Sequence, residues 1–106
     1  MLDVGLESYL LVSAAMFSLG LGVVVVRRNA IALLCGLELI LNASALNFVA
    51  FNRYSGAPGR LDGQVFAIFI IILAAAEAAI ALAILLNLFH HTNSLRVDEA
   101  DQLREE

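Results

Sequence analysis

The sequence predicts an all-α integral membrane protein with three transmembrane helices. Of its 106 residues, 61% are hydrophobic and 15% are charged, whereas ordinary globular domains carry about 25% charged residues. Three apolar runs, at about residues 6–26, 30–51 and 64–89, each reach the roughly 20 residues that cross ~30 Å of hydrocarbon. None of them alternates apolar and polar residues as a barrel strand does. We therefore expect a three-helix transmembrane domain over 1–90 and an acidic cytoplasmic tail over 91–106.

The first apolar run is long enough to cross the membrane, and basic residues follow it instead of preceding it. A secretory signal peptide has the opposite order, so this run is expected to stay in the protein. The connection to the second run is little more than Arg27, Arg28 and Asn29. So short a connection predicts a tight antiparallel helix hairpin.

The second and third runs are joined by residues 52–63, which contain the only proline and several glycines. Such residues break helices and turn the chain at a water interface. In the first run, Ala14, Ser18 and Gly22 recur at four-residue spacing. Small residues let helices approach closely in a bilayer, so this stripe predicts a packing seam.

Arginine sets the predicted orientation, because the chain contains no lysine. Four arginines, including Arg27 and Arg28, fall on one side of the three spans and two fall on the other. Basic residues are enriched in cytoplasmic loops. Arg27 and Arg28 are therefore predicted to form a cytoplasmic basic loop, with the N-terminus outside and the C-terminus cytoplasmic.

Two glutamates, Glu38 and Glu77, lie inside separate apolar runs that contain no basic residue. An ionised side chain in hydrocarbon is costly, and such residues usually serve a function. A carboxylic acid in hydrocarbon is stabilised in its neutral form until water or a cation reaches it, so it can bind and release protons. We interpret both as proton-relay residues. The alternative is a glutamate that stays protonated and only hydrogen-bonds between helices.

The helical rise of 1.5 Å per residue places both glutamates in the membrane interior. Glu38 is expected ~13 Å from the cytoplasmic end of its helix and Glu77 ~20 Å from either end of its own. The two carboxylates should lie at similar but staggered levels, with Glu38 nearer the cytoplasm. They can then act as successive stations for a proton.

The second run also contains three polar residues that we predict to support the glutamates: Asn42, Ser44 and Asn47. Asn42 follows Glu38 by four residues and shares its helix face, so it can hydrogen-bond the acid or hold a water molecule. The alternative is that Asn42 joins two helices by a hydrogen bond.

Other chemistry is not indicated. The sequence has no nucleophile constellation, phosphate-binding glycine loop, thiolate cluster or dinucleotide fingerprint, so we expect no catalytic residue and no bound cofactor in this chain. His90 and His91 are adjacent and point in different directions, which makes them poor metal ligands.

The acids crowd into the tail, so nucleic acid is not an expected partner. Three helices cannot enclose two buried acids, which implies other membrane proteins around the chain, besides lipid.

The order and spacing of several motifs resemble one known family, the subunit K (ND4L) family of bacterial NADH-quinone oxidoreductase. The resemblance covers nearly the whole chain before the tail, on the segments Arg28-Asn29-Ala30, Gly36-Leu37-Glu38-Leu39, Leu41-Asn42-Ala43, Asp62-Gly63-Gln64-Val65 and Ala74-Ala75-Ala76-Glu77-Ala78. It implies a non-redox subunit in the membrane arm of respiratory complex I, a translocase in which electron transport from NADH to quinone drives proton translocation. FMN, iron–sulfur clusters and quinone would lie in the rest of the complex.

The same resemblance carries the family's two glutamates over to Glu38 and Glu77, in a charged axis along the membrane arm. It implies neighbours that resemble subunits A, J and N, and a location in the bacterial cell inner membrane. Two alternatives stay open: the small subunit of a multisubunit cation/proton antiporter, and a purely structural bridging subunit. Hydrogenase and photosynthetic complexes contain similar subunits, whereas a rotary-ATPase proteolipid usually has two helices instead of three.

Overall fold

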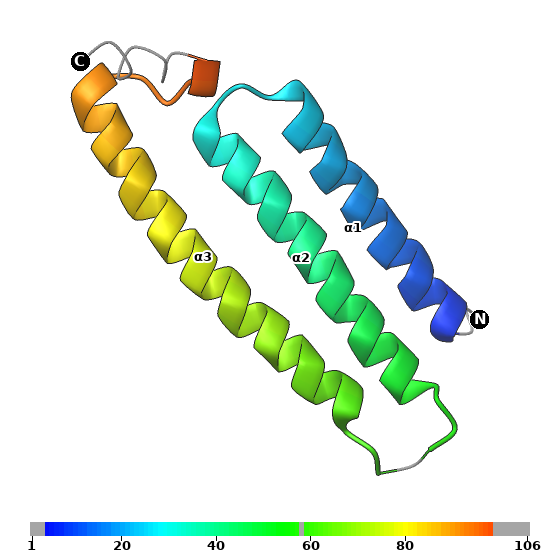
Figure 1. The fold of residues 1–106 in the computed structure, drawn as a ribbon. Coiled ribbons are helices and arrows are strands. Elements are labelled where there is room, and N and C mark those ends of the chain that lie inside the picture. The colour runs from blue at the N-terminus through cyan, green and yellow to red at the C-terminus, as the bar shows by residue number, and fades with distance from the viewer. Residues whose placement is uncertain (1–3, 58, 99–106) are drawn as a thin grey trace.

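A computed structural model of the chain describes residues 4–57 and 59–98, which form three long helices. They are α1 (Leu6–Val26), α2 (Ala30–Arg53) and α3 (Asp62–Thr92). The helices lie side by side and antiparallel, with α2 between the other two (Figure 1). The molecule is a flat slab of 58 × 26 × 19 Å, with α1 and α3 at opposite edges.

The three helices have 21, 24 and 31 residues and are apolar enough to cross a membrane, which confirms the predicted fold class. The first helix has the bounds of its predicted span. The spans predicted at 30–51 and 64–89 lie within helices that continue two or three residues farther. Half of the predicted tail, residues 99–106, lies outside the described residues.

Local sequence explains where the helices begin and end. The side-chain oxygen of Asn29 accepts hydrogen bonds from the backbone amides of Ile31 (2.9 Å) and Ala32 (3.2 Å), so it caps the N-terminus of α2. At the end of α3, Asn93 adopts a left-handed conformation with φ 55°, and its amide bonds the carbonyl of Phe89. Asparagine tolerates this conformation, which commonly terminates a helix.

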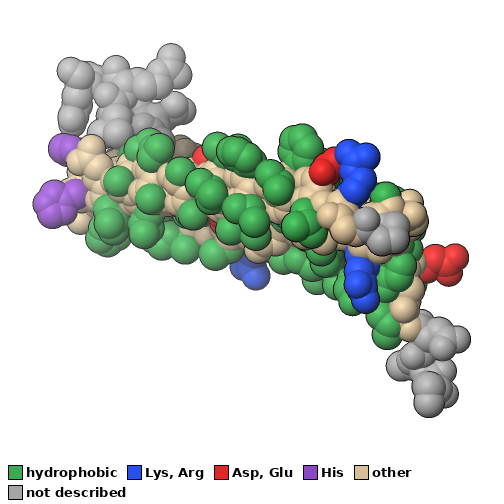
Figure 2. Space-filling model, turned by 90° about the horizontal axis from the view of Figure 1, so that it is seen from below, with side chains coloured by type: hydrophobic (Ala, Val, Ile, Leu, Met, Phe, Trp, Pro, Cys, Tyr) green, Lys and Arg blue, Asp and Glu red, His purple; other side chains and the backbone are tan. Residues whose placement is uncertain are grey.

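Large hydrophobic side chains lie mainly on the outside of the slab, where green atoms cover most of its length (Figure 2). The buried positions within the helices are all small residues, and many recur every seven residues. The seven-residue rows are Ser13 and Gly20 on α1, Gly36, Ala43 and Ala50 on α2, and Ala67 and Ala74 on α3. In lipid, apolar burial gives no drive for helices to associate, and small residues allow the close backbone contact that does.

The backbones of α1 and α2 come close together at Gly20 and Gly36. A Cβ atom on Gly20 would lie 2.7 Å from the carbonyl oxygen of Gly36 and 2.8 Å from Cγ1 of Ile40. A Cβ atom on Gly36 would lie 2.9 Å from the carbonyl oxygen of Gly20. Only glycine fits at both positions without moving a helix backbone.

The packing seam predicted at Ala14, Ser18 and Gly22 does not lie against another helix of the described chain, so it stays a prediction for a helix of another protein. All three residues are exposed, and a Cβ on Gly22 would meet nothing within 4 Å. A four-residue row turns about 40° around the helix per step and a seven-residue row about 20°. Only the seven-residue row stays along a neighbour that is nearly antiparallel.

The segment that follows α3 crosses back to the connection between α1 and α2. The amide of Ala30 donates to the carbonyl of Leu95 (2.8 Å), and the amide of Val97 donates to the carbonyl of Arg28 (3.2 Å). We call residues 93–98 the strap. It ties the C-terminal end of α3 to the predicted cytoplasmic basic loop.

Asp98 adds ionic contacts to the strap. Its Oδ2 lies 2.8 Å from Nη2 of Arg96 and 3.9 Å from Nη1 of Arg28. The hydrogen bond from Arg96 holds the pKa of the Asp98 carboxyl below its ordinary value. A lowered carboxyl pKa means that the ion pair stabilises the strap above pH about 3.8 and loses this effect as the pH falls through the lowered pKa.

Valine at position 20 should force α1 and α2 apart. We expect Gly20→Val to destabilise the chain by about 1–3 kcal/mol, because its side chain must displace backbone of α2. Gly22→Val is the matched control, because the same side chain there meets open space. Thermal unfolding in detergent, followed by circular dichroism, measures the difference. Equal melting temperatures would mean that the helices do not meet at Gly20.

Asparagine at position 98 should loosen the strap. At neutral pH we expect Asp98→Asn to speed hydrogen exchange at the amides of Ala30 and Val97 by about two- to five-fold, a small effect because exposed ion pairs are weak. In the unmodified chain, protection of these two amides from exchange should stay constant above pH about 3.8. Below that pH it should fall, because Asp98 becomes protonated. Asp62→Asn, which removes the pair with Arg60 at the opposite end, is the control and should leave both amides unchanged.

Candidate functional site

Glu38 lies in the first half of α2 and is half-buried within the chain. Gly36, two residues earlier, is buried against α1. Successive residues lie about 100° apart around a helix, so Glu38 points away from α1 and toward the α3 side of α2. The central helix therefore carries one carboxylate beside its contact with α3.

Glu77 lies near the middle of α3 and is exposed on the surface of the chain. Ala74, one turn earlier, is 4% exposed and faces α2. Ala78 and Ala81 are half-buried on the same side. Glu77 thus lies at the edge of the α2–α3 contact, and this chain by itself does not bury its carboxylate.

The register between α2 and α3 puts the two glutamates at one level. The rings of Phe48 and Phe66 stack with centroids 5.7 Å apart. The helices are antiparallel, so ten residues back from Phe48 along α2 corresponds to ten residues onward from Phe66 along α3. These steps lead to Glu38 and Ala76, the residue next to Glu77.

The expected stagger between the two carboxylates is therefore wrong. That expectation measured each depth from the ends of its own helix, and the ends are not level. The register places the start of α2 opposite residue 84 or so, and α3 continues to Thr92. The strap then returns from Asn93 to the level of Ala30.

The two glutamates lie on opposite sides of the line along which α2 and α3 touch. Glu38 shares its helix face with Asn42 and Val49, which lie four and eleven residues onward. Together with Ile71 of α3, these two residues line a shallow hollow of about 380 Å³ on one broad side of the slab. We call this the Glu38 side.

Glu77 belongs to the other broad side. It shares its helix face with Phe66, eleven residues earlier on α3. Phe66 stacks on Phe48 of α2. Leu46 of α2 lines the hollow on the Glu38 side, and Phe48 lies about 160° around the helix from Leu46. Phe48 and Phe66 are therefore on the opposite broad side. We call this the Glu77 side. One pair of packed helices therefore presents one carboxylate to each broad side of the slab.

Neither carboxylate has a hydrogen bond or an ion pair with any residue in 4–57 or 59–98. The chain has no lysine, and its arginines lie outside the interior of the three helices. An ionised glutamate in hydrocarbon needs water or a cation beside it. Within residues 4–57 and 59–98, no cation lies beside either carboxylate.

The three predicted supporting residues do not form one cluster. Asn42 is exposed and lies on the Glu38 side, but no hydrogen bond joins the two side chains within the described part of the chain. Ser44 donates to the carbonyl of Ile40 at 3.3 Å. Asn47 is half-buried and lies toward α1 together with Ser44. Of the three predicted supporting residues, only Asn42 lies on the same side of α2 as Glu38.

Ser13 is a polar residue that the sequence interpretation missed. It is 2% exposed, and its hydroxyl donates to the carbonyl of Ala43 at 2.9 Å. The bond joins α1 to α2 inside the predicted bilayer. The sequence feature that could have identified Ser13 is its seven-residue spacing from Gly20, because both residues belong to the row of α1 that is buried against α2.

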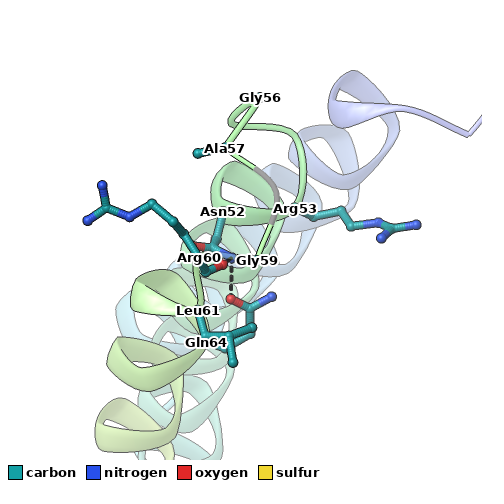
Figure 3. Close-up of a pocket in the computed structure, with 8 residues that line it drawn as sticks. All are labelled: Asn52, Arg53, Gly56, Ala57, Gly59, Arg60, Leu61 and Gln64. Atoms are coloured by element: carbon teal, nitrogen blue, oxygen red, sulfur yellow. Dashed lines mark hydrogen bonds between the residues drawn. The ribbon is translucent and has the colours of Figure 1, made fainter.

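A hydrogen-bonded turn closes the connection between α2 and α3. The side-chain amide of Asn52 donates to the carbonyl of Arg60 (2.7 Å) and to Gln64, and its oxygen accepts from the amide of Gly63 (3.0 Å). Arg53 and Arg60 point away from each other around this turn (Figure 3). Their side chains therefore do not converge on a common anion site.

The remaining polar groups form no obvious reaction centre. No group of three metal-ligating side chains comes together in 4–57 and 59–98. His90 and His91 are exposed in the last turn of α3. Arg27 is exposed, and Arg28 lies beside the strap. The two membrane glutamates are therefore the candidate functional site.

Comparison with known proteins gives a consistent family match. The chain matches the family model of NADH-ubiquinone/plastoquinone oxidoreductase chain 4L over residues 8–105. It is 44% identical to NADH-quinone oxidoreductase subunit K of Chlorobaculum parvum over 104 residues, covering 98% of this chain and 96% of that protein. Both glutamates lie within the matched residues.

Two further relatives come from different lineages. NADH-quinone oxidoreductase subunit K of Acidithiobacillus ferrooxidans is 51% identical over 100 residues, covering 93% of this chain and 92% of the relative. The chloroplastic NAD(P)H-quinone oxidoreductase subunit 4L of Staurastrum punctulatum is 48% identical over 99 residues, covering 93% and 96%. Each relative matches this chain along nearly its whole length.

The different exposure of the two glutamates predicts different reactivity toward a hydrophobic carbodiimide, which modifies protonated carboxyls in lipid. In the chain extracted alone into detergent, Glu77 should react several-fold faster than Glu38, because it is exposed whereas Glu38 is half-buried. Mass spectrometry of the labelled peptides measures both rates, and Glu77→Gln identifies the Glu77 product. Faster labelling of Glu38 would contradict the arrangement of α2 and α3.

Proposed function

This chain belongs to the NADH-ubiquinone/plastoquinone oxidoreductase chain 4L family, as a non-redox membrane subunit of NADH-quinone oxidoreductase, and we propose that it relays protons between its neighbours through Glu38 and Glu77. The observation that carries the proposal is the placement of these carboxylates. They lie at one level in the membrane, on opposite sides of one helix pair, without a partner in the described chain.

This placement suits lateral transfer. A subunit on the Glu38 side and another on the Glu77 side can each bring water or a cation to one carboxylate. A nearby positive charge favours the ionised form of an acid, and its withdrawal favours protonation. Charges that move in the neighbours during turnover therefore load and unload the two glutamates in sequence.

The neighbours that we propose resemble subunits A, J and N of the same complex. Because the chain contributes no lysine, any lysine beside Glu38 or Glu77 comes from one of them. FMN, the iron–sulfur clusters and quinone belong to other parts of the complex.

We further propose that the protein lies in the bacterial cell inner membrane, with the N-terminus outside and the C-terminus cytoplasmic. The bias of arginine toward the α1–α2 connection and the strap supports this orientation. The strap then lies on the cytoplasmic side and the turn around Asn52 on the other.

Two alternatives differ in what the glutamates do. A subunit of a multisubunit cation/proton antiporter was one alternative, because it has the same three-helix plan. The family match favours the oxidoreductase over it. A purely structural bridging subunit would keep both acids protonated throughout turnover. Infrared difference spectroscopy of the carboxyls separates that case from a relay, because only a relay changes their protonation.

Glutamine keeps the size of glutamate but cannot ionise, so it tests the relay directly. We expect Glu77→Gln alone, and the double variant Glu38→Gln/Glu77→Gln, to lower NADH-driven proton pumping about ten-fold or more, because each loses a proton-transfer group. Assembly should be intact. Pumping is measured by quenching of a pH-sensitive dye in membrane vesicles, and assembly by NADH oxidation with a soluble electron acceptor.

Glu7→Gln, an exposed acid in the first turn of α1, is the matched control and should pump normally. If the assembled double variant of Glu38 and Glu77 also pumps normally, the relay proposal is wrong. The bridging role would then stand.

A further inference from the structure

One face of α2 is left open by the helices on its two flanks. Cys35, Asn42 and Val49 recur on it every seven residues, and all three are exposed. We call these three residues the open row. It lies on the Glu38 side, because Glu38 shares its helix face with Asn42 and Val49. A seven-residue row stays along a neighbouring helix that crosses at about 20°, so the open row has the spacing of a helix-packing surface.

The hollow on the Glu38 side lies along this row. All three helices contribute to its lining, with α2 between the other two (Figure 1). Ala45 of α2 and Ala67 of α3 line it and are only 6% and 3% exposed, so small residues form its floor. Met16 of α1 and Ile71 of α3 bound it on either flank of α2. A helix that lies over α2 can place a side chain in this hollow, as ridges enter grooves in helix packing.

Asn42 places an amide group at the middle of the membrane span. It lies twelve residues after the start of α2 and eleven before its end, which is ~17 Å from either. Its side chain is exposed and makes no hydrogen bond with any residue in 4–57 or 59–98. An amide without hydrogen bonds is costly in hydrocarbon, because lipid tails neither donate nor accept. The amide therefore favours a polar partner over lipid at this depth.

The hollow and the amide together define what fits on this face. A lipid chain fills the apolar hollow but leaves the amide of Asn42 without a hydrogen bond. A transmembrane helix with one polar side chain meets both requirements, and asparagine commonly hydrogen-bonds across helices in membranes. The amide of Asn42 both donates and accepts, so it matches a hydroxyl, another amide or a protonated acid.

We propose that the Glu38 side binds one transmembrane helix of another subunit, which lies along the open row and hydrogen-bonds Asn42 through a polar side chain. An apolar side chain of the same helix, about one turn nearer the α2–α3 turn, fills the hollow. This partner helix deepens the function proposed above, because it belongs to the subunit on the Glu38 side. The contact rests on that subunit and not on proton transfer by Glu38.

Three variants separate the hydrogen bond from simple packing. Asn42→Leu removes the amide and keeps a side chain of similar size, whereas Asn42→Gln keeps an amide. Asn87→Leu makes the leucine change at an exposed position on α3, outside the hollow, and serves as the matched control. The register places Asn87 beyond the level at which α2 begins, so its amide lies nearer the membrane surface.

The first measurement is the release of this chain from the purified intact complex as detergent concentration rises, followed on native gels. Loss of one hydrogen bond between membrane helices changes association by roughly three- to twenty-fold. Asn42→Leu should raise the ratio of released to bound chain by that factor, whereas Asn42→Gln and Asn87→Leu should release less. Equal release by Asn42→Leu and either of the other two variants would overturn the proposal.

The second measurement leaves Asn42 in place, so it does not depend on assembly of the leucine variant. A photo-activatable benzophenone amino acid replaces Val49, which lines the hollow, in the intact complex in its own membrane. We expect it to cross-link to a membrane-spanning segment of another subunit, identified by mass spectrometry of the joined peptides. Cross-links to lipid alone, or to a second copy of this chain, would overturn the proposal.

The matched control carries the same amino acid in place of Phe51. Phe51 is exposed and lies about 180° around α2 from Asn42, so it should not cross-link to the segment that Val49 reaches. The same segment captured from both positions would contradict a helix bound on the Glu38 side.

The outcome is distinguishable from that of the relay. If the assembled Glu38→Gln/Glu77→Gln complex pumps normally, the relay fails, and the cross-link from position 49 still identifies the partner helix. If the cross-link is absent while that double variant stops pumping, the relay stands and the partner helix does not.

Discussion

Close backbone contact between helices is the constraint on which the rest of this structure depends. The membrane removes the usual drive for apolar side chains to gather inside a protein, so the helices associate where small residues let them touch. Gly20 against Gly36 is one example, since a side chain on either would meet the opposite backbone, and Gly63 of α3 lies still closer to the Phe48 carbonyl of α2. Small residues repeated every seven positions extend this contact along α2 on both of its flanks.

A flat row of helices follows from that arrangement, and the flat row decides where the carboxylates go. A closed bundle would enclose its polar residues, but a slab with one central helix has two broad sides. Glu38 and Glu77 reach opposite sides from one shared contact. The described residues position two acids in the membrane-spanning segments and give neither of them a charged partner.

The same argument applies to the polar atoms between α1 and α2. Ser13 and Ser44 donate their hydroxyl hydrogens to backbone carbonyls, whereas Asn47 Oδ1 has no hydrogen-bond partner among the described residues. Helices that pack through small residues leave room beside them.

Hydropathy alone determined the three helices and the presence of two acids in the membrane, because a span needs only length and apolar composition, and an unpaired charge in it is conspicuous. Sequence patterns did not identify the seam, since small residues at four-residue and at seven-residue spacing both occur on α1 and only contact with α2 chooses between them. Nor did they give the level of Glu38 relative to Glu77. Levels and sides depend on how far one helix slides and turns against another, and this is decided by tertiary packing at residues far apart in the chain.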